Sequence, residues 1–155
     1  MENGGMKLFA SVVLGIVIAI FVGVGINLFY PEPSYPTELM TFSNSEPTDA
    51  EAEESNLAYM EFEKERQLHS GIVGVISIAL AVLVMGGSML LAKKNDVVSQ
   101  GLLVGGLLLI CYGATQAISS GNMMTAFISI GVGLLALIVF ILKRFRVANG
   151  ETVQS

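Results

Sequence analysis

Three polar side chains on one long apolar segment are the strongest candidates for chemistry in this chain. Tyr112, Thr115 and Gln116 are spaced i, i+3 and i+4, which places them on one face of a helix. A phenol, a hydroxyl and an amide can bind a small polar ligand or line an ion pathway, or they can hydrogen-bond to a neighbouring helix. The sequence therefore predicts a polar pathway or a helix-packing contact at this face.

The other reactive side chains are isolated. Cys111 is the single cysteine, so the chain can form no internal disulfide, and we interpret it as a small apolar residue. His69 is the single histidine and lacks a second ligand, so we interpret it as a pH-responsive group at the membrane interface or as functionally silent. Motifs of serine hydrolases, zinc proteases and phosphate-binding loops are missing from the sequence. We expect no catalytic residue, no metal site, no cofactor and no enzymatic activity.

Acidic residues cluster in one polar segment, where they are either a weak cation site or a solvated helix face. They are Glu46, Asp49, Glu51, Glu53 and Glu54. A calcium loop needs ligands at fixed alternate positions around a turn enforced by glycine, and this pattern is missing.

The composition excludes most other classes of protein. Of 155 residues, 53% are hydrophobic and 14% are charged, and the formal net charge is −5. A soluble domain of this size needs a larger charged share to cover its surface, and a disordered chain is far less hydrophobic. A disulfide-rich secreted module needs several cysteines. The class that remains is an integral membrane protein.

Four uninterrupted apolar stretches are each long enough to cross a bilayer as a helix. They cover Leu8–Tyr30, Ser70–Ala92, Val97–Ser119 and Met123–Leu142. Gly121 and Asn122 favour a tight turn, at residues 120–122, between the last two stretches. The predicted fold class is an all-α membrane protein with four transmembrane helices. The first stretch is longer than a signal-peptide core, and we interpret it as an uncleaved anchor.

The distribution of basic residues predicts the orientation of these helices. Six of the eight fall on one side of the membrane, in segments 1–7, 93–96 and 143–155, and those of the last two segments are expected to anchor the helix ends. The six are Lys7, Lys93, Lys94, Lys143, Arg144 and Arg146. Only Lys64 and Arg66 fall on the other side. The positive-inside rule predicts that both termini are cytoplasmic, in a protein of the cell membrane.

The external segment 31–69 carries most of the acidity of the chain. It contains ten acidic and two basic residues, a net charge of −8. Its first part, 31–47, begins with three prolines in six positions and is expected to be extended. We expect this part to follow the membrane surface, with Tyr30 and Tyr35 at the depth of the headgroups.

The second part of the external segment, 48–69, is predicted to be a helical stalk on the second transmembrane helix. Thr48 and Glu51 fit a capping box, and no Gly or Pro interrupts the chain before Ser70, so one helix should run to about Ala92. Two pairs at i, i+3 are expected to add local support: Glu61 with Lys64 and Glu63 with Arg66. The apolar stalk residues expected to dock on the proline-rich part are Tyr59, Phe62 and Leu68.

The four stretches contain no charged side chain, which argues against ion or proton chemistry inside a span. Small residues instead recur at four-residue spacing, which lets helix backbones approach closely. We expect helix packing at Gly15, Ala19 and Gly23 of the first stretch and at Gly101 and Gly105 of the third. The third stretch also carries more polar residues than any other and is expected to be the centre of the bundle.

Two motifs resemble small uncharacterised multi-pass membrane proteins of uncultured bacterial lineages. They are Gly-Ile-Asn-Leu-Phe-Tyr-Pro-Glu-Pro at Gly25–Pro33 and Gly-Gly-Leu-Leu-Leu-Ile-Cys-Tyr-Gly at Gly105–Gly113. The resemblance implies a multi-pass fold and carries no established activity. Small multidrug transporters are similar in size, but their glutamate in the first span is missing here.

Two functional hypotheses follow from the sequence. The first is a structural or interaction protein whose acidic stalk contacts a protein partner or the cell envelope. The alternative is a small channel or transporter subunit, built by homo-oligomerisation around the Tyr112, Thr115 and Gln116 face. Partners expected under these hypotheses are the lipid bilayer, a second copy of the chain and a protein at the stalk, and no nucleic acid is expected.

Overall fold

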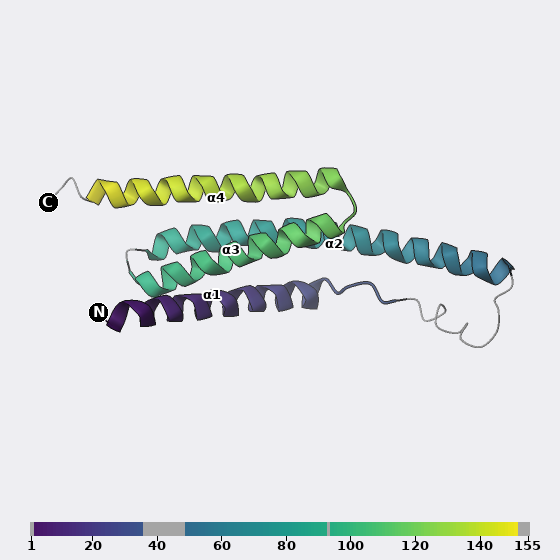
Figure 1. Ribbon diagram of the computed structural model, residues 1–155, viewed down its shortest axis with the longest axis horizontal. Coiled ribbons are helices and arrows are strands. Elements are labelled where there is room, and N and C mark those ends of the chain that lie inside the picture. The colour runs from purple at the N-terminus through teal and green to yellow at the C-terminus, as the bar shows by residue number, and fades with distance from the viewer. Residues whose placement is uncertain (1, 36–48, 93, 152–155) are drawn as a thin grey trace.

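The protein is an antiparallel arrangement of long helices, shown by a computed structural model that describes residues 2–35, 49–92 and 94–151 (Figure 1). The helices are α1 (Glu2–Phe29), α2 (Asp49–Leu91), α3 (Asp96–Ser119) and α4 (Met123–Glu151). All four contain a segment long and apolar enough to cross a membrane. The predicted fold class is confirmed. The described chain is all-helical with four candidate membrane helices, and the second of them extends well beyond the other three as a stalk (Figure 1).

Helix α2 is a single element of 43 residues that joins the stalk to the second membrane segment. It begins at Asp49, one residue after the predicted start, and it ends at Leu91. Thr48 and the side chain of Glu51 lie outside the described residues, so the expected capping box does too. The uninterrupted helix agrees with the lack of Gly and Pro in the stalk.

Helices α1 and α4 are longer than their apolar stretches. Helix α1 starts at Glu2, six residues before the predicted span, and α4 continues past Lys143 to Glu151. Charged residues beyond the hydrocarbon still make good helix formers, so polarity ends a membrane span without ending the helix. At its other end α1 stops before Pro31, where Tyr30 N–H donates the last bond to the Ile26 carbonyl at 2.8 Å.

Helices α2 and α3 pack backbone against backbone through glycines. A Cβ atom added to Gly74 would lie 2.9 Å from the Gly113 carbonyl oxygen, and one added to Gly113 would lie 2.9 Å from the Gly74 carbonyl oxygen. Towards the α2–α3 turn, Gly106 leaves the space that the Met85 side chain occupies. Glycine is required at these positions because any side chain would separate the helices.

Helices α1 and α3 run in parallel and also touch through small residues. The Ser11 hydroxyl donates to the Val97 carbonyl at 3.1 Å, and a Cβ atom on Gly15 would lie 2.9 Å from the Gly101 carbonyl oxygen. Helix α3 thus lies between α1 and α2, which barely touch each other, and it contacts α4 as well. This confirms the central position predicted for the third stretch.

The turn between α3 and α4 closes as a tight hairpin. Gly121 has a φ of +66°, in the left-handed region that glycine adopts without steric cost. The Asn122 side-chain oxygen accepts from the backbone N–H groups of Met124 at 3.0 Å and Thr125 at 3.2 Å, which caps α4. The predicted turn at 120–122 is therefore present.

Candidate functional site

The chain that leaves α1 contacts the base of the stalk. We call Tyr30–Tyr35 the strap. The Tyr30 ring stacks on the His69 ring, with centroids 4.6 Å apart and planes 3° from parallel. Beyond that contact, Glu32 pairs with Arg66 at 3.6 Å, and Tyr35 packs edge-on against Phe62 with centroids 5.1 Å apart. These contacts confirm the expected docking of Phe62 on the proline-rich part, whereas the expected path along the membrane surface stays a prediction.

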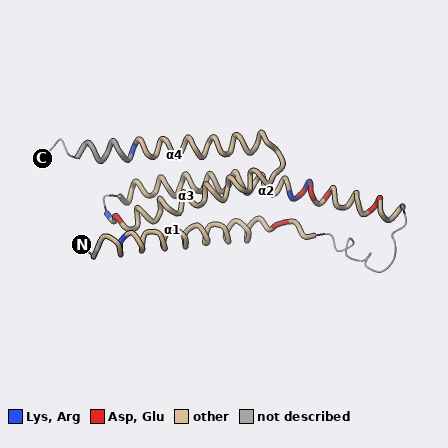
Figure 2. Tube along the Cα trace, in the orientation of Figure 1, with Lys and Arg blue, Asp and Glu red and all other residues tan. Residues whose placement is uncertain are grey.

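The strap also replaces one of the predicted charge pairs of the stalk. Arg66 points its guanidinium to Glu32 of the strap, and within the described chain it makes no ion pair with Glu63. Glu63 instead accepts a hydrogen bond from the Gln67 amide at 3.3 Å. Glu61 and Lys64 are both exposed and lie farther apart than a salt bridge. Charges along the stalk are visible in Figure 2, where acidic residues outnumber basic ones.

Beside the strap, a groove of about 660 Å³ lies between α1, α2 and α3. We call it the three-helix groove. It brings Tyr112 and Gln116 together with Asn27 of α1 and with the stacked Tyr30 and His69. The Gln116 amide donates to the Tyr112 hydroxyl at 3.2 Å, so two of the three predicted polar residues interact directly.

The third predicted residue, Thr115, does not line this groove. Its exposed hydroxyl donates to the backbone carbonyls of Cys111 and Tyr112, both at 2.8 Å. This pattern is the usual local use of a threonine inside a membrane helix, where the donor is satisfied within its own turn. The i, i+3, i+4 spacing predicts that the three residues share one face of α3, but only Tyr112 and Gln116 lie on the part of that face that borders the groove.

The polar groups of the three-helix groove lie at its stalk end only. Ile16, Ile20 and Leu108 line the part nearer the opposite membrane face. A groove that is polar at one end and apolar at the other suits an amphipathic molecule, and it does not form a polar path across the bilayer.

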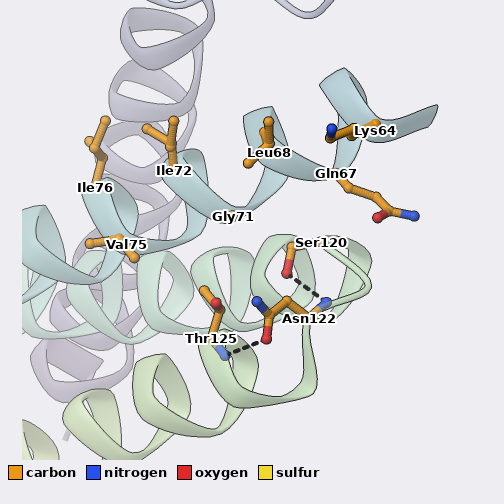
Figure 3. A pocket seen from close by; sticks show the side chains of 10 residues that line it. All are labelled: Lys64, Gln67, Leu68, Gly71, Ile72, Val75, Ile76, Ser120, Asn122 and Thr125. Carbon is orange, nitrogen blue, oxygen red and sulfur yellow. Dashed lines mark hydrogen bonds between the residues drawn. The ribbon is translucent and has the colours of Figure 1, made fainter. Parts of the chain in front are cut away.

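A second groove, of about 470 Å³, lies between α2 and the α3–α4 turn (Figure 3). We call it the hairpin groove. Sequence reasoning missed it, although a lysine above an unbroken apolar helix face was a readable signal. Its polar lining is Lys64, Gln67, Ser120, Asn122 and Thr125, and its other lining residues are Leu68, Gly71, Ile72, Val75 and Ile76.

The predicted packing residues fall into two groups, one in a helix contact and one lining a groove. Gly15, Gly101 and Gly105 lie in the contact between α1 and α3, where Gly105 faces the Gly15 carbonyl oxygen and Ile18. Ala19 and Gly23 line the three-helix groove, and a Cβ atom on Gly23 would have no atom within 4 Å. The packing contact therefore covers the first half of the small-residue stripe in α1.

The predicted anchoring residues that the structure describes lie at the end of the bundle opposite the stalk. Lys94 and Lys143 are exposed. Lys93 lies outside the described residues, and Arg144 and Arg146 belong to α4 with side chains outside them. Cys111 has an exposed thiol face on α3.

The acidic end of the stalk is solvated where it is described. Glu53 and Glu54 are exposed, whereas Glu46 and the side chains of Asp49 and Glu51 lie outside the described residues. Over the described ranges, no three His, Cys, Asp or Glu side chains gather as metal ligands would.

Comparison with known proteins returns no match: no family model, no curated protein and no solved structure is similar to this chain. The resemblance of Gly25–Pro33 and Gly105–Gly113 to small multi-pass membrane proteins stays a prediction. Function must therefore be argued from the geometry of the stalk and the grooves.

Proposed function

We propose that this protein is a structural or interaction protein of the cell membrane whose acidic stalk binds a basic partner outside the cell. The observation that carries the proposal is the continuity of α2 from Asp49 to Leu91, which connects an exposed acidic surface directly to a membrane helix. Such a surface is positioned by the bundle and needs no separate domain to hold it.

The strap supports this function because it braces the stalk at its base. A single helix projecting into water is marginal on its own, and tertiary contacts along its side stabilise it. The contacts of Tyr30, Glu32 and Tyr35 with α2 extend over two turns of the stalk. The exposed acidic residues beyond and beside them are Glu53, Glu54, Glu61 and Glu65.

Charge then determines the kind of partner. An acidic surface attracts a basic one over several ångströms and speeds their encounter, an effect that salt weakens. The partner is therefore a protein or envelope component with a basic surface outside the cell.

The test is site-specific photocrosslinking in native membranes. A photoreactive residue at Glu54 should crosslink to a partner, and the same residue at Leu134, which is exposed on α4, should crosslink to lipid only. Glu53→Gln with Glu54→Gln should reduce the yield from a reporter at Asn56. A stalk that crosslinks to nothing at low salt, while the protein is correctly inserted, would overturn the proposal.

A second candidate function is a channel or transporter subunit built by homo-oligomerisation. The observation in its favour is the hydrogen-bonded pair of Tyr112 and Gln116 in the three-helix groove. Reconstituted liposomes should then leak ions or small solutes, and Gln116→Leu should reduce the flux. Liposomes that stay sealed at a protein density sufficient for oligomers would rule this function out.

A further inference from the structure

One stripe of α2 changes character stepwise as it enters the membrane. Starting outside, it carries an acidic residue, a basic residue and then apolar residues only. The stripe comprises Glu61, Lys64, Leu68, Ile72 and Val75, whose spacings of three and four keep them on one helix face. All except Glu61 line the hairpin groove.

The membrane level at this groove is marked by three neighbouring contacts. Tyr30 stacks on His69, a Cβ atom on Gly71 would lie 3.4 Å from the Ser120 Cβ atom, and the α3–α4 turn packs on Gln67. The ends of all four apolar helices on the stalk side therefore coincide near Ser70. At 1.5 Å per residue, Lys64 lies about 9 Å outside this level, within the headgroup layer, and Ile76 about 9 Å inside it.

The turn adds a fixed hydrogen-bond donor to the mouth of the groove. The Asn122 side-chain oxygen is committed to capping α4, as it accepts from Met124 and Thr125. The amide nitrogen must then point away from α4, and in Figure 3 it is turned towards the α2 side of the groove. Because the cap fixes the rotamer, this donor is preorganised for an acceptor in the groove.

We propose that the hairpin groove binds one phospholipid with a primary-amine headgroup from the leaflet on the stalk side. One acyl chain lies against Ile72 and Val75. The phosphate accepts from the Lys64 ammonium and the Asn122 amide. The headgroup ammonium lies farther out, at the Glu61 carboxylate.

The order of charges selects this lipid over others. Glu61 and Lys64 are one helical turn apart, about 4.5 Å along the axis, which matches the short ethylene link between phosphate and amine. Within the described chain neither side chain makes an ion pair, and both are exposed. A choline headgroup has no N–H to donate to Glu61. A headgroup with no amine has no positive charge to offset the repulsion between its phosphate and the acidic stalk.

The absence of tryptophan from the sequence gives a clean reporter. Ile72→Trp places a single fluorophore in the groove, and Leu134→Trp places the control on exposed α4. Each full-length variant is reconstituted in phosphatidylcholine vesicles, into which phosphatidylethanolamine, phosphatidylglycerol or phosphatidylcholine with brominated acyl chains is titrated. Bromine quenches the fluorescence of a tryptophan in contact with it, so quenching measures occupancy of the groove.

At Ile72→Trp, brominated phosphatidylethanolamine should bind about threefold more tightly than brominated phosphatidylcholine, a ratio that corresponds to one modest ion pair. Adding Glu61→Gln to this variant should bring that ratio to about 1. Adding Lys64→Gln instead should weaken the binding of phosphatidylethanolamine and of phosphatidylglycerol to the same extent. Lys94→Gln, at an exposed lysine of the opposite end, should change nothing. The Leu134→Trp reporter should respond equally to all three lipids.

Two results would overturn the proposal. Equal quenching of Ile72→Trp by the three lipids would mean that the groove holds bulk lipid without selection. Preference for phosphatidylglycerol would mean that Lys64 acts alone and that Glu61 takes no part. Far-ultraviolet circular dichroism of each variant shows whether the helices are intact, so that a change in quenching reports binding.

Discussion

Ser88 of α2 and Ser99 of α3 donate hydrogen bonds to each other's backbone carbonyl oxygens, at 2.8 and 2.9 Å. Both residues are completely buried, and their hydroxyl oxygens are 3.2 Å apart. Backbone groups in a membrane helix are already bonded within the helix, so side-chain hydroxyls are the main donors that can join two helices. This reciprocal pair fastens the α2–α3 hairpin on the side of Lys94.

Removing either hydroxyl should loosen that hairpin. Ser88→Ala and Ser99→Ala are each expected to lower the free energy of unfolding by about 1 kcal/mol. The double variant should lose less than the sum, because the two bonds form one unit. Unfolding in mixed micelles measures both effects, with Ser119→Ala, whose exposed hydroxyl bonds only to Thr115 of its own helix, as the control. Strict additivity would show that the two serines act independently.

A methyl group at the α2–α3 contact should be more harmful than one on an open helix face. Gly113→Ala places a Cβ atom 2.9 Å from the Gly74 carbonyl oxygen and 2.8 Å from the Ile78 side chain, and it should cost about 1–3 kcal/mol. Gly131→Ala meets no atom within 4 Å and should be neutral or stabilising, since alanine favours helix. Thermal unfolding of the two variants compares them directly, and equal melting temperatures would contradict the close approach at Gly113.

The strap should depend on its aromatic contacts more than on its ion pair, because exposed ion pairs contribute little. A spin label at Ser34→Cys, in a Cys111→Ala background, reports the mobility of the strap. Phe62→Ala removes the partner of Tyr35 and should make the label clearly more mobile, whereas Arg66→Gln should have a smaller effect. Tyr59→Ala, half-exposed on the same stalk, serves as control. Equal mobility of the label in all variants would show that the strap does not pack on the stalk.

The predicted orientation can be tested by cysteine labelling of intact cells. Each in the Cys111→Ala background, Glu54→Cys puts an exposed thiol near the start of α2 and Lys94→Cys puts one just beyond its end. A maleimide that does not cross membranes should label Glu54→Cys at once and Lys94→Cys only after lysis. The reverse order would invert the topology and move the acidic stalk into the cytoplasm.

Sequence patterns predicted the elements of this fold well, because the signals were local. An apolar stretch of bilayer length predicts a helix whatever lies next to it, and Gly121 with Asn122 predicts a turn from its own backbone preferences. The limits of α1 and α4 were less well predicted, since hydropathy follows the membrane boundary and the helix does not end there. The start of α3 had a local signal that was missed: Asn95 caps it by accepting from Val98 N–H at 3.3 Å.

Contacts between segments far apart in the chain could not be predicted from local sequence patterns. Glu63 was the expected partner of Arg66 from its spacing, but Glu32 approaches from a segment more than thirty residues away. The hairpin groove exists because Gly71 and Gly121 let the turn approach α2, and nothing in either local pattern indicates the other. Tyr112 and Gln116 were predicted to share a face, and the closeness of Asn27 and His69 came from the packing of α1.

The unbroken length of α2 connects the stalk rigidly to the membrane bundle. A helix of 43 residues is about 65 Å long, and its glycine Gly74 meets Gly113 of α3 near the stalk-side end of the bundle. Ser88 and Ser99 fasten the other end of the same helix to α3, so a sideways load on the stalk tip is carried by the α2–α3 hairpin along its length. A partner bound at Glu53 and Glu54 would therefore load the membrane-embedded hairpin directly, because no break in α2 separates the acidic surface from the bundle.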